Sequence, residues 1–131
     1  MEKLELLKRA LIALENSYSP YSNYKVGAAV LLKNGEVITG TNIENASYGL
    51  TNCAERSALF TAYSLGYRKE DIEGLAIASL STPPASPCGA CRQVINELME
   101  LNAYVVFGNE NEMYETKVED LLPLAFNKEC L

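Results

Sequence analysis

Two short cysteine motifs restrict the possible folds of this chain more than any other feature: Cys53-Ala54-Glu55 and Pro87-Cys88-Gly89-Ala90-Cys91. Cys88 and Cys91 are separated by one helical turn, so both lie on one face at the start of a predicted helix. Cys53 lies at the start of another predicted helix, and residues 54–87 leave room for one helix and one strand between the motifs. If parallel strands lead into both helices, the two helix N-termini lie at the same edge of a sheet. The three thiols can then meet at that edge.

A cluster of three thiols has the chemistry of a zinc site. Zinc accepts thiolates in tetrahedral geometry, and a catalytic zinc keeps three protein ligands and an open position for water. The chain contains no histidine, and we predict one Zn²⁺ per chain, bound by Cys53, Cys88 and Cys91. The alternative is a structural zinc-binding module in which Cys130 is the fourth ligand. Cys130 has no second cysteine near it, which favours the catalytic interpretation.

Two charged residues close to Cys53 are candidates for action at this site. Glu55 is not needed as a ligand, and a carboxylate beside a metal-activated water is a natural proton shuttle. The alternative role for Glu55 is a capping box with Asn52. Arg56 can hydrogen-bond the sulfurs and offset the excess negative charge that three thiolates leave on zinc. The alternative for Arg56 is a surface salt bridge.

Length and charge limit the remaining classes of function. The 131 residues suffice for one compact domain, predicted to span 1–131. The net charge of −6 and the lack of a basic cluster argue against a nucleic-acid partner. No apolar run approaches the ~20 residues of a membrane span, and the acidic start of the chain does not resemble a signal peptide. We therefore expect a cytoplasmic protein without a membrane partner, in which four cysteines indicate metal binding or catalysis rather than disulfides.

The spacing of apolar residues predicts an alternation of helices and strands. Leucines at helical spacing from Leu4 to Leu14 predict an amphipathic helix over 2–16, and Asn34-Gly35 predicts a hairpin of strands over 24–33 and 36–43. The further expected elements are a helix capped by Asn52 that ends at Gly66, a strand over 75–80, a helix over 88–101, a strand over 103–107, an edge strand over 112–118 and a short helix over 119–126. The order in the middle implies right-handed crossovers between neighbouring parallel strands. We expect a three-layer α/β/α sandwich with a mixed five-stranded sheet and helices on both faces.

With these residues and several further motifs, the chain resembles the small homotetrameric cytidine deaminases of the cytidine and deoxycytidylate deaminase superfamily. Zinc base deaminases as a class pair three zinc ligands and a non-ligand Glu with Pro-Cys-x-x-Cys. The matching segments are Tyr21-Ser22-Asn23-Tyr24-Lys25-Val26-Gly27-Ala28-Ala29, Asn42-Ile43-Glu44-Asn45-Ala46-Ser47-Tyr48, Asn52-Cys53-Ala54-Glu55-Arg56, Ser86-Pro87-Cys88-Gly89-Ala90-Cys91-Arg92-Gln93 and Leu121-Leu122-Pro123. The resemblance runs from about Tyr18 to Phe126, and the combined pattern is highly specific.

The resemblance implies a substrate-binding role for several residues outside the cysteine motifs. Asn42 and Glu44 match the pair that binds the ribose 3′-hydroxyl, and an amide with a carboxylate can serve both the donor and the acceptor of a hydroxyl. Tyr24 matches an aromatic position against the pyrimidine that is often Phe, so its phenol is a departure from the pattern. The backbone of Ala54 is expected to hold the pyrimidine, and the Ser86 carbonyl to accept a hydrogen bond from the leaving amine.

The resemblance also implies that active sites are shared between subunits. Phe126 matches an aromatic residue that a neighbouring subunit places over each site. Tyr48 matches a second cross-subunit contact. The expected assembly is a homotetramer.

The implied reaction is the hydrolytic deamination of cytidine and deoxycytidine to uridine and deoxyuridine in pyrimidine salvage. In it Glu55 takes a proton from a water activated by zinc, the water attacks C4 of cytosine, and Glu55 returns protons to N3 and to the departing ammonia. The alternative within enzymes is a deaminase of another aminopyrimidine nucleoside, such as a nucleoside antibiotic. The sequence does not rank cytidine against deoxycytidine.

Overall fold

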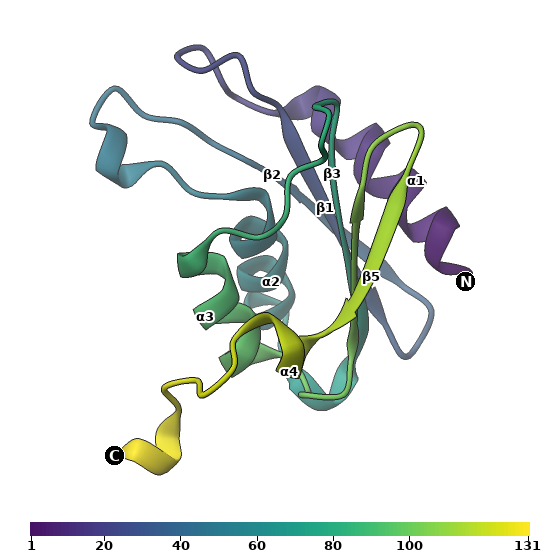
Figure 1. The fold of residues 1–131 in the computed structure, drawn as a ribbon, viewed down its shortest axis with the longest axis vertical. Coiled ribbons are helices and arrows are strands. Elements are labelled where there is room, and N and C mark those ends of the chain that lie inside the picture. Colours follow the sequence, from purple (N-terminus) through teal and green to yellow (C-terminus); the bar gives the residue numbers. More distant parts are fainter.

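A mixed sheet of five strands forms the middle layer of the computed structural model, which describes residues 1–131 (Figure 1). The strands are β1 (Val26–Leu32), β2 (Val37–Thr41), β3 (Ile72–Ser79), β4 (Tyr104–Gly108) and β5 (Met113–Lys117). Their order across the sheet is β2-β1-β3-β4-β5. The pair β3 and β4 is parallel, and the other neighbouring pairs are antiparallel.

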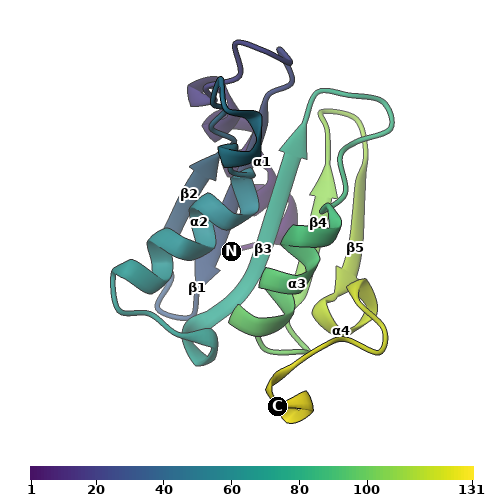
Figure 2. The same ribbon diagram turned by 90° about the vertical axis from the view of Figure 1, so that its left-hand side faces the viewer.

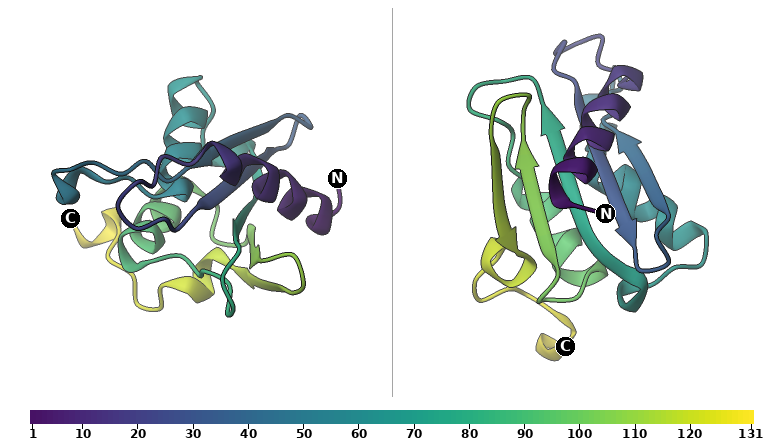
Figure 3. Two further views of the ribbon diagram at one scale, coloured as in Figure 1. Left: turned by 90° about the horizontal axis from the view of Figure 1, so that it is seen from above. Right: turned by 90° about the vertical axis from the view of Figure 1, so that its right-hand side faces the viewer.

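Helices cover both faces of this sheet (Figures 2 and 3). The helix α1 (Lys3–Ala13) packs on one face, and α2 (Ala54–Ser64), α3 (Gly89–Leu98) and α4 (Val118–Leu121) pack on the other. Short 3₁₀ turns lie at Leu14–Asn16, Tyr48–Leu50, Lys69–Asp71 and Lys128–Cys130. The predicted three-layer α/β/α sandwich is therefore confirmed. None of the helices has both the length and the apolar character needed to cross a membrane.

The strand β1 accounts for one difference from the predicted topology. We expected β2 and β3 to be parallel neighbours, but β1 lies between them and pairs antiparallel with both. Side chains of β1 alternate between two cores: Val30 faces α2 and α3, and Leu31 faces α1. A strand that is apolar on both faces must be covered on both sides, whereas β2 exposes Thr39 and forms the edge. Because β2 and β3 still run in the same direction, α2 and α3 begin at the same edge of the sheet.

The predicted start of α2 is wrong by one residue. Cys53, not Asn52, occupies the N-cap position, and no side chain caps the helix. Asn52 instead pairs with Ile43 in an isolated β-bridge. The predicted stop holds, because Gly66 adopts a φ of +100° that lets the chain leave the helix.

Two further helices are shorter than expected, and one buries a different face. The helix predicted over 88–101 spans 89–98, and the helix predicted over 119–126 ends at Leu121. Leu122 precedes Pro123, and a residue before proline is disfavoured in helical conformation. In α1, Leu4 is half exposed, because the helix turns Leu6 and its neighbours toward the sheet.

Gly40 in β2 determines how closely α2 can approach the sheet. A Cβ at this position would lie 2.5 Å from the Ala58 nitrogen and 2.9 Å from the Ala54 oxygen. Only glycine leaves room for this backbone contact. The contact seats the first turn of α2, and with it Cys53 and Glu55, against the sheet.

Candidate active site

The three cysteines predicted as zinc ligands come together at the N-termini of α2 and α3. Cys53 is the N-cap of α2, Cys88 is the N-cap of α3, and Cys91 lies in the first turn of α3. Their sulfur atoms lie within 4.8 Å of one another, and the sulfurs of Cys53 and Cys88 are 3.9 Å apart. Zn–S bonds of about 2.3 Å in tetrahedral geometry require sulfurs about 3.8 Å apart. The cluster therefore fits a zinc ion with little movement.

The surroundings of the cluster stabilise deprotonated sulfur. Hydrogen bonding from the Cys91 thiol and from Arg56 lowers the pKa of Cys53 to about 5. Conversely, the Cys53 sulfur and burial raise the pKa of Cys91, so the two share a proton that a divalent cation would displace. The two helix N-termini add about half a positive charge each. The donor set and its electrostatics thus suit zinc, with Arg56 and the helix ends offsetting the charge of the thiolates.

Cys130 lies outside this cluster. It is exposed in the last 3₁₀ turn of the chain, whereas the sulfurs that approach one another are those of Cys53, Cys88 and Cys91. A closed site with four cysteine ligands therefore does not fit the structure. The arrangement leaves the fourth position of the metal free.

Glu55 is a buried carboxylate beside the thiols. Its side chain is only 4% exposed, and burial raises its pKa to about 7. The nearby Cys53 thiolate acts in the same direction. The capping-box alternative is wrong, because Cys53 is the N-cap and the Asn52 amide donates to Ser57 Oγ at 3.2 Å instead. Glu55 is free for proton transfer.

A pocket of about 510 Å³ opens beside the cluster. Its lining includes nine of the residues predicted from the sequence: Tyr24, Asn42, Glu44, Tyr48, Cys53, Ala54, Glu55, Ser86 and Cys88. The sequence did not single out the six other lining residues, Ser22, Val26, Thr51, Asn52, Ile77 and Ala85, for this pocket. Ser22 and Asn52 stand inside the motifs that carry the resemblance, whereas Ile77 reads only as part of a buried strand.

Glu44 is held as an anion at one end of the pocket. Its Oε1 accepts the backbone N–H groups of Tyr21 and Ser22 at 3.0 and 3.1 Å, and the Ser22 hydroxyl donates to Oε2. The hydrogen bond from this hydroxyl is the main reason that the pKa of Glu44 is lowered. Three donors leave the carboxylate with spare acceptor capacity and no proton of its own.

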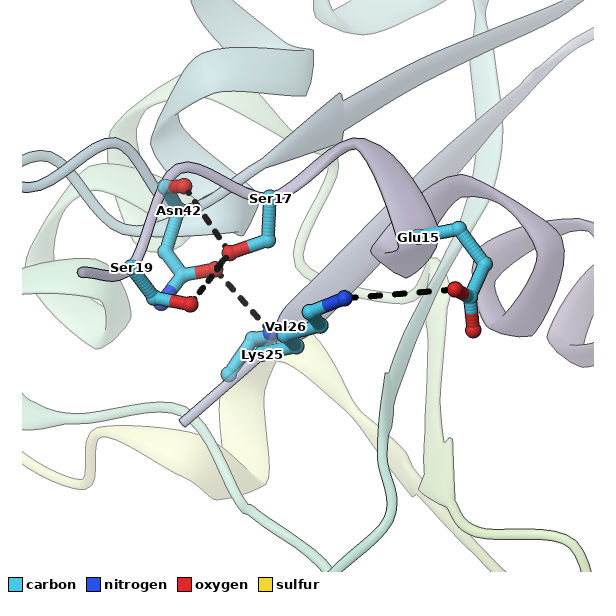
Figure 4. Close-up of polar contacts among 6 residues, drawn as sticks. All are labelled: Glu15, Ser17, Ser19, Lys25, Val26 and Asn42. Carbon is cyan, nitrogen blue, oxygen red and sulfur yellow. Dashed lines mark hydrogen bonds and ion pairs between the residues drawn. The ribbon is translucent and has the colours of Figure 1, made fainter. Parts of the chain in front are cut away.

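Asn42 is oriented by a set of polar contacts on the side away from the pocket (Figure 4). Its Oδ1 accepts from the Ser17 hydroxyl and from the Val26 N–H, the latter at 3.0 Å. Its Nδ2 donates to the Tyr24 carbonyl at 2.7 Å. Both lone pairs of the amide oxygen are therefore used, and the amide has one N–H left to offer.

The remaining predicted residues differ in their relation to the pocket. Arg56 lies behind the cluster and donates to the Cys53 sulfur. Tyr48 is exposed at the pocket rim, on the 3₁₀ turn Tyr48–Leu50. Phe126 is also exposed and does not line the pocket of its own chain.

The comparison with protein families agrees with this geometry. The family described as "Cytidine and deoxycytidylate deaminase zinc-binding region" matches residues 1–108. The chain belongs to the cytidine and deoxycytidylate deaminase family. The zinc-binding character of this family accords with the three-thiol cluster, and zinc is the cofactor that the site fits.

Individual members of the deaminase family are similar over nearly the whole chain. A cytidine deaminase of Halalkalibacterium halodurans is 52% identical over 130 residues, which cover 98% of this chain and 97% of that protein. The crystal structure of a cytidine deaminase from Burkholderia pseudomallei superposes with a TM-score of 0.93 at 47% identity and covers 96% of this chain and 100% of its own. A blasticidin-S deaminase of Bacillus cereus is more distant, at 28% identity over 137 residues that cover 97% of this chain and 94% of that protein.

Proposed function

We propose that this chain catalyses the zinc-dependent hydrolytic deamination of cytidine and deoxycytidine, which yields uridine or deoxyuridine and ammonia. The observation that carries the proposal is the position of Glu55, buried beside three thiols and facing a pocket of about 510 Å³. Pockets of this size take small organic ligands. A zinc ion held by Cys53, Cys88 and Cys91 would supply a water molecule activated for attack.

Glu55 is the residue we assign to proton transfer. Hydrolysis at C4 requires that a water lose a proton, that N3 gain one and that the departing amino group gain one. A general acid–base group works best with a pKa near the operating pH, and the pKa of Glu55 is raised to about 7. Glu55 would accept the proton of the water and return protons to the base. We assign the backbone of Ala54 to the pyrimidine and the Ser86 carbonyl to the leaving amine, since both residues line the pocket.

The sugar would bind at the end of the pocket where Asn42 and Glu44 lie. The ionised Glu44 can only accept a hydrogen bond, and Asn42 has only an N–H to donate. A ribose hydroxyl can meet both requirements at once, by donating to Glu44 and accepting from Asn42. We assign this hydroxyl as the 3′-hydroxyl, and the ring of Tyr24 to the face of the substrate.

The charge of the pocket favours a free nucleoside over a nucleotide. Its charged lining residues are Glu44 and Glu55, and neither lysine nor arginine lines it. A phosphate group would meet anionic carboxylates without a compensating cation. The same argument disfavours deoxycytidylate and cytosine within nucleic acid, in keeping with the net charge of −6.

We further propose a cytoplasmic homotetramer of one-domain chains, each spanning 1–131, in which neighbouring subunits complete each site. Tyr48 and Phe126 are large aromatic side chains that lie exposed, and such residues are enriched at protein interfaces. Phe126 lies outside the pocket of its own chain, which is consistent with a contact to a neighbour.

The direct test is purified, zinc-loaded protein mixed with cytidine, with the ultraviolet change on formation of uridine as the readout. Parallel reactions contain deoxycytidine, cytidine 5′-monophosphate and a cytosine-containing nucleoside antibiotic. We expect rapid turnover of both nucleosides and poor turnover of the nucleotide. A protein that turned over the antibiotic and not cytidine would instead be a deaminase of the second class.

A further inference from the structure

The segment Leu80–Pro87 is held in place by side chains rather than by backbone pairing. It brings Ser86 to the pocket and leads directly into Cys88, yet it contains no helix or strand. No backbone-to-backbone hydrogen bond involves residues 80–87. The position of one thiol of the cluster therefore depends on how well side chains fix this segment.

Ser79 and Asn109 supply two of these side-chain contacts. Ser79, at the end of β3, accepts the Ala85 N–H on its hydroxyl oxygen at 2.8 Å. The Asn109 amide donates to the Ser81 carbonyl at 2.9 Å. These bonds anchor the segment to the sheet and to the end of β4.

Ser81 lies at the centre of the remaining contacts. Its hydroxyl donates to the Pro83 carbonyl at 2.8 Å, and its Oγ lies 2.6 Å from the Tyr24 hydroxyl and 3.1 Å from Ser79 Oγ. A serine hydroxyl has one proton and two lone pairs. Since the proton goes to Pro83, Tyr24 and Ser79 must both donate to Ser81. Every bonding position of the Ser81 hydroxyl is thus filled.

We propose that the hydroxyl of Tyr24 is a positioning group for the segment that carries Ser86 and Cys88. Tyr24 belongs to the stretch before β1, so its bond to Ser81 ties that wall of the pocket to the segment leading into α3. This role belongs to the hydroxyl and is separate from the contact of the ring with the substrate. Only the kinetic part of its test rests on the proposed function.

Tyr24→Phe tests the proposal because it removes the hydroxyl and keeps the ring. With the segment less fixed, zinc should transfer to an excess of a coloured chelator about threefold to tenfold faster. The kcat for cytidine should fall by a similar factor while KM stays within twofold, because the ring still faces the substrate. Tyr67→Phe is the matched control: its hydroxyl donates to Glu36 at 3.1 Å away from the pocket, and its loss should change neither quantity.

A double-mutant cycle shows whether the effect passes through Ser81. Ser81→Ala should reproduce the faster zinc release, and adding Tyr24→Phe to it should cause no further change. Ser81→Thr, which keeps a hydroxyl, should stay near the wild type. The proposal is overturned if Tyr24→Phe releases zinc at the wild-type rate, or if its effect persists in full in the Ser81→Ala background. A wild type inactive on cytidine would refute the proposed function, while the chelator measurement would still decide the positioning role.

Discussion

The Arg56 guanidinium donates a hydrogen bond of 3.3 Å to the sulfur of Cys53, the N-cap of the same helix. The guanidinium is always protonated, so it keeps a positive charge next to the thiol cluster at any working pH. Its Nε is buried without a hydrogen-bond partner, which shows that the side chain is committed to this location despite the cost. We infer that Arg56 offsets the negative charge of three thiolates.

Arg56→Gln should lower zinc affinity, kcat or both by about 10- to 100-fold, the usual effect of losing a residue that supports a metal ligand. The measurements are zinc binding by competition with a chelator and turnover of cytidine. Arg68→Gln is the matched control, because Arg68 donates to the carbonyls of Tyr63 and Tyr67 far from the cysteines. Equal losses in the two variants would contradict the role of Arg56.

The stability of the zinc-free protein should depend on pH through Glu55. Burial raises its pKa from 4.5 to about 7, so between these values the folded state binds more protons than the unfolded state. The free energy of unfolding should therefore fall as pH rises from 4.5 to 7, by up to about 3 kcal/mol from this residue. Glu55→Gln should remove this contribution. Urea unfolding of both proteins across this range gives the difference, and parallel curves would contradict the assignment.

The sugar end of the pocket should discriminate between the two ribose hydroxyls. Loss of the 3′-hydroxyl leaves Glu44 without its donor, so 3′-deoxycytidine should have a kcat/KM about 10- to 100-fold below that of cytidine. Loss of the 2′-hydroxyl should cost less. Glu44→Gln should narrow the difference between the substrates, because the amide can donate as well as accept. Equal tolerance of both losses would contradict the placement of the sugar.

The sharing of sites between subunits can be tested with two inactive or weakened parents. Phe126→Ala should weaken substrate binding by ~1–3 kcal/mol, the scale of a lost aromatic stack on a base, and should leave zinc bound. When this variant is dissociated and reassembled with Glu55→Gln, some sites would combine an intact Glu55 with an intact Phe126. Activity in the mixture should exceed the sum of the parents. A fully active monomer by light scattering would contradict the shared site.

The sequence was sufficient to predict the cysteine cluster, because helical spacing and the direction of strands decide where Cys53, Cys88 and Cys91 lie. Both parts of this prediction are local rules that hold in most folds. The same rules predicted the hairpin at Asn34-Gly35, which the structure confirms with Gly35 at a φ of +93°.

Other features depend on tertiary packing and could not be read from spacing. The insertion of β1 between β2 and β3 follows from the need to cover a strand that is apolar on both faces. The Ile77 wall of the pocket is an ordinary core residue until the helices leave it uncovered. The N-cap at Cys53 rather than Asn52 reflects the bridge that Asn52 makes with Ile43.

The central claim is that Glu55 transfers protons beside a zinc ion that it does not bind, and Glu55→Gln tests this claim most directly. Zinc content and turnover of cytidine are measured on the same preparation, with Cys130→Ser as a control that should match the wild type in both. The account predicts one zinc per chain in the Glu55→Gln variant and a fall in kcat of about 10⁴-fold or more, the upper end of general acid–base effects. Activity within tenfold of the wild type, or loss of zinc with the carboxylate, would contradict it.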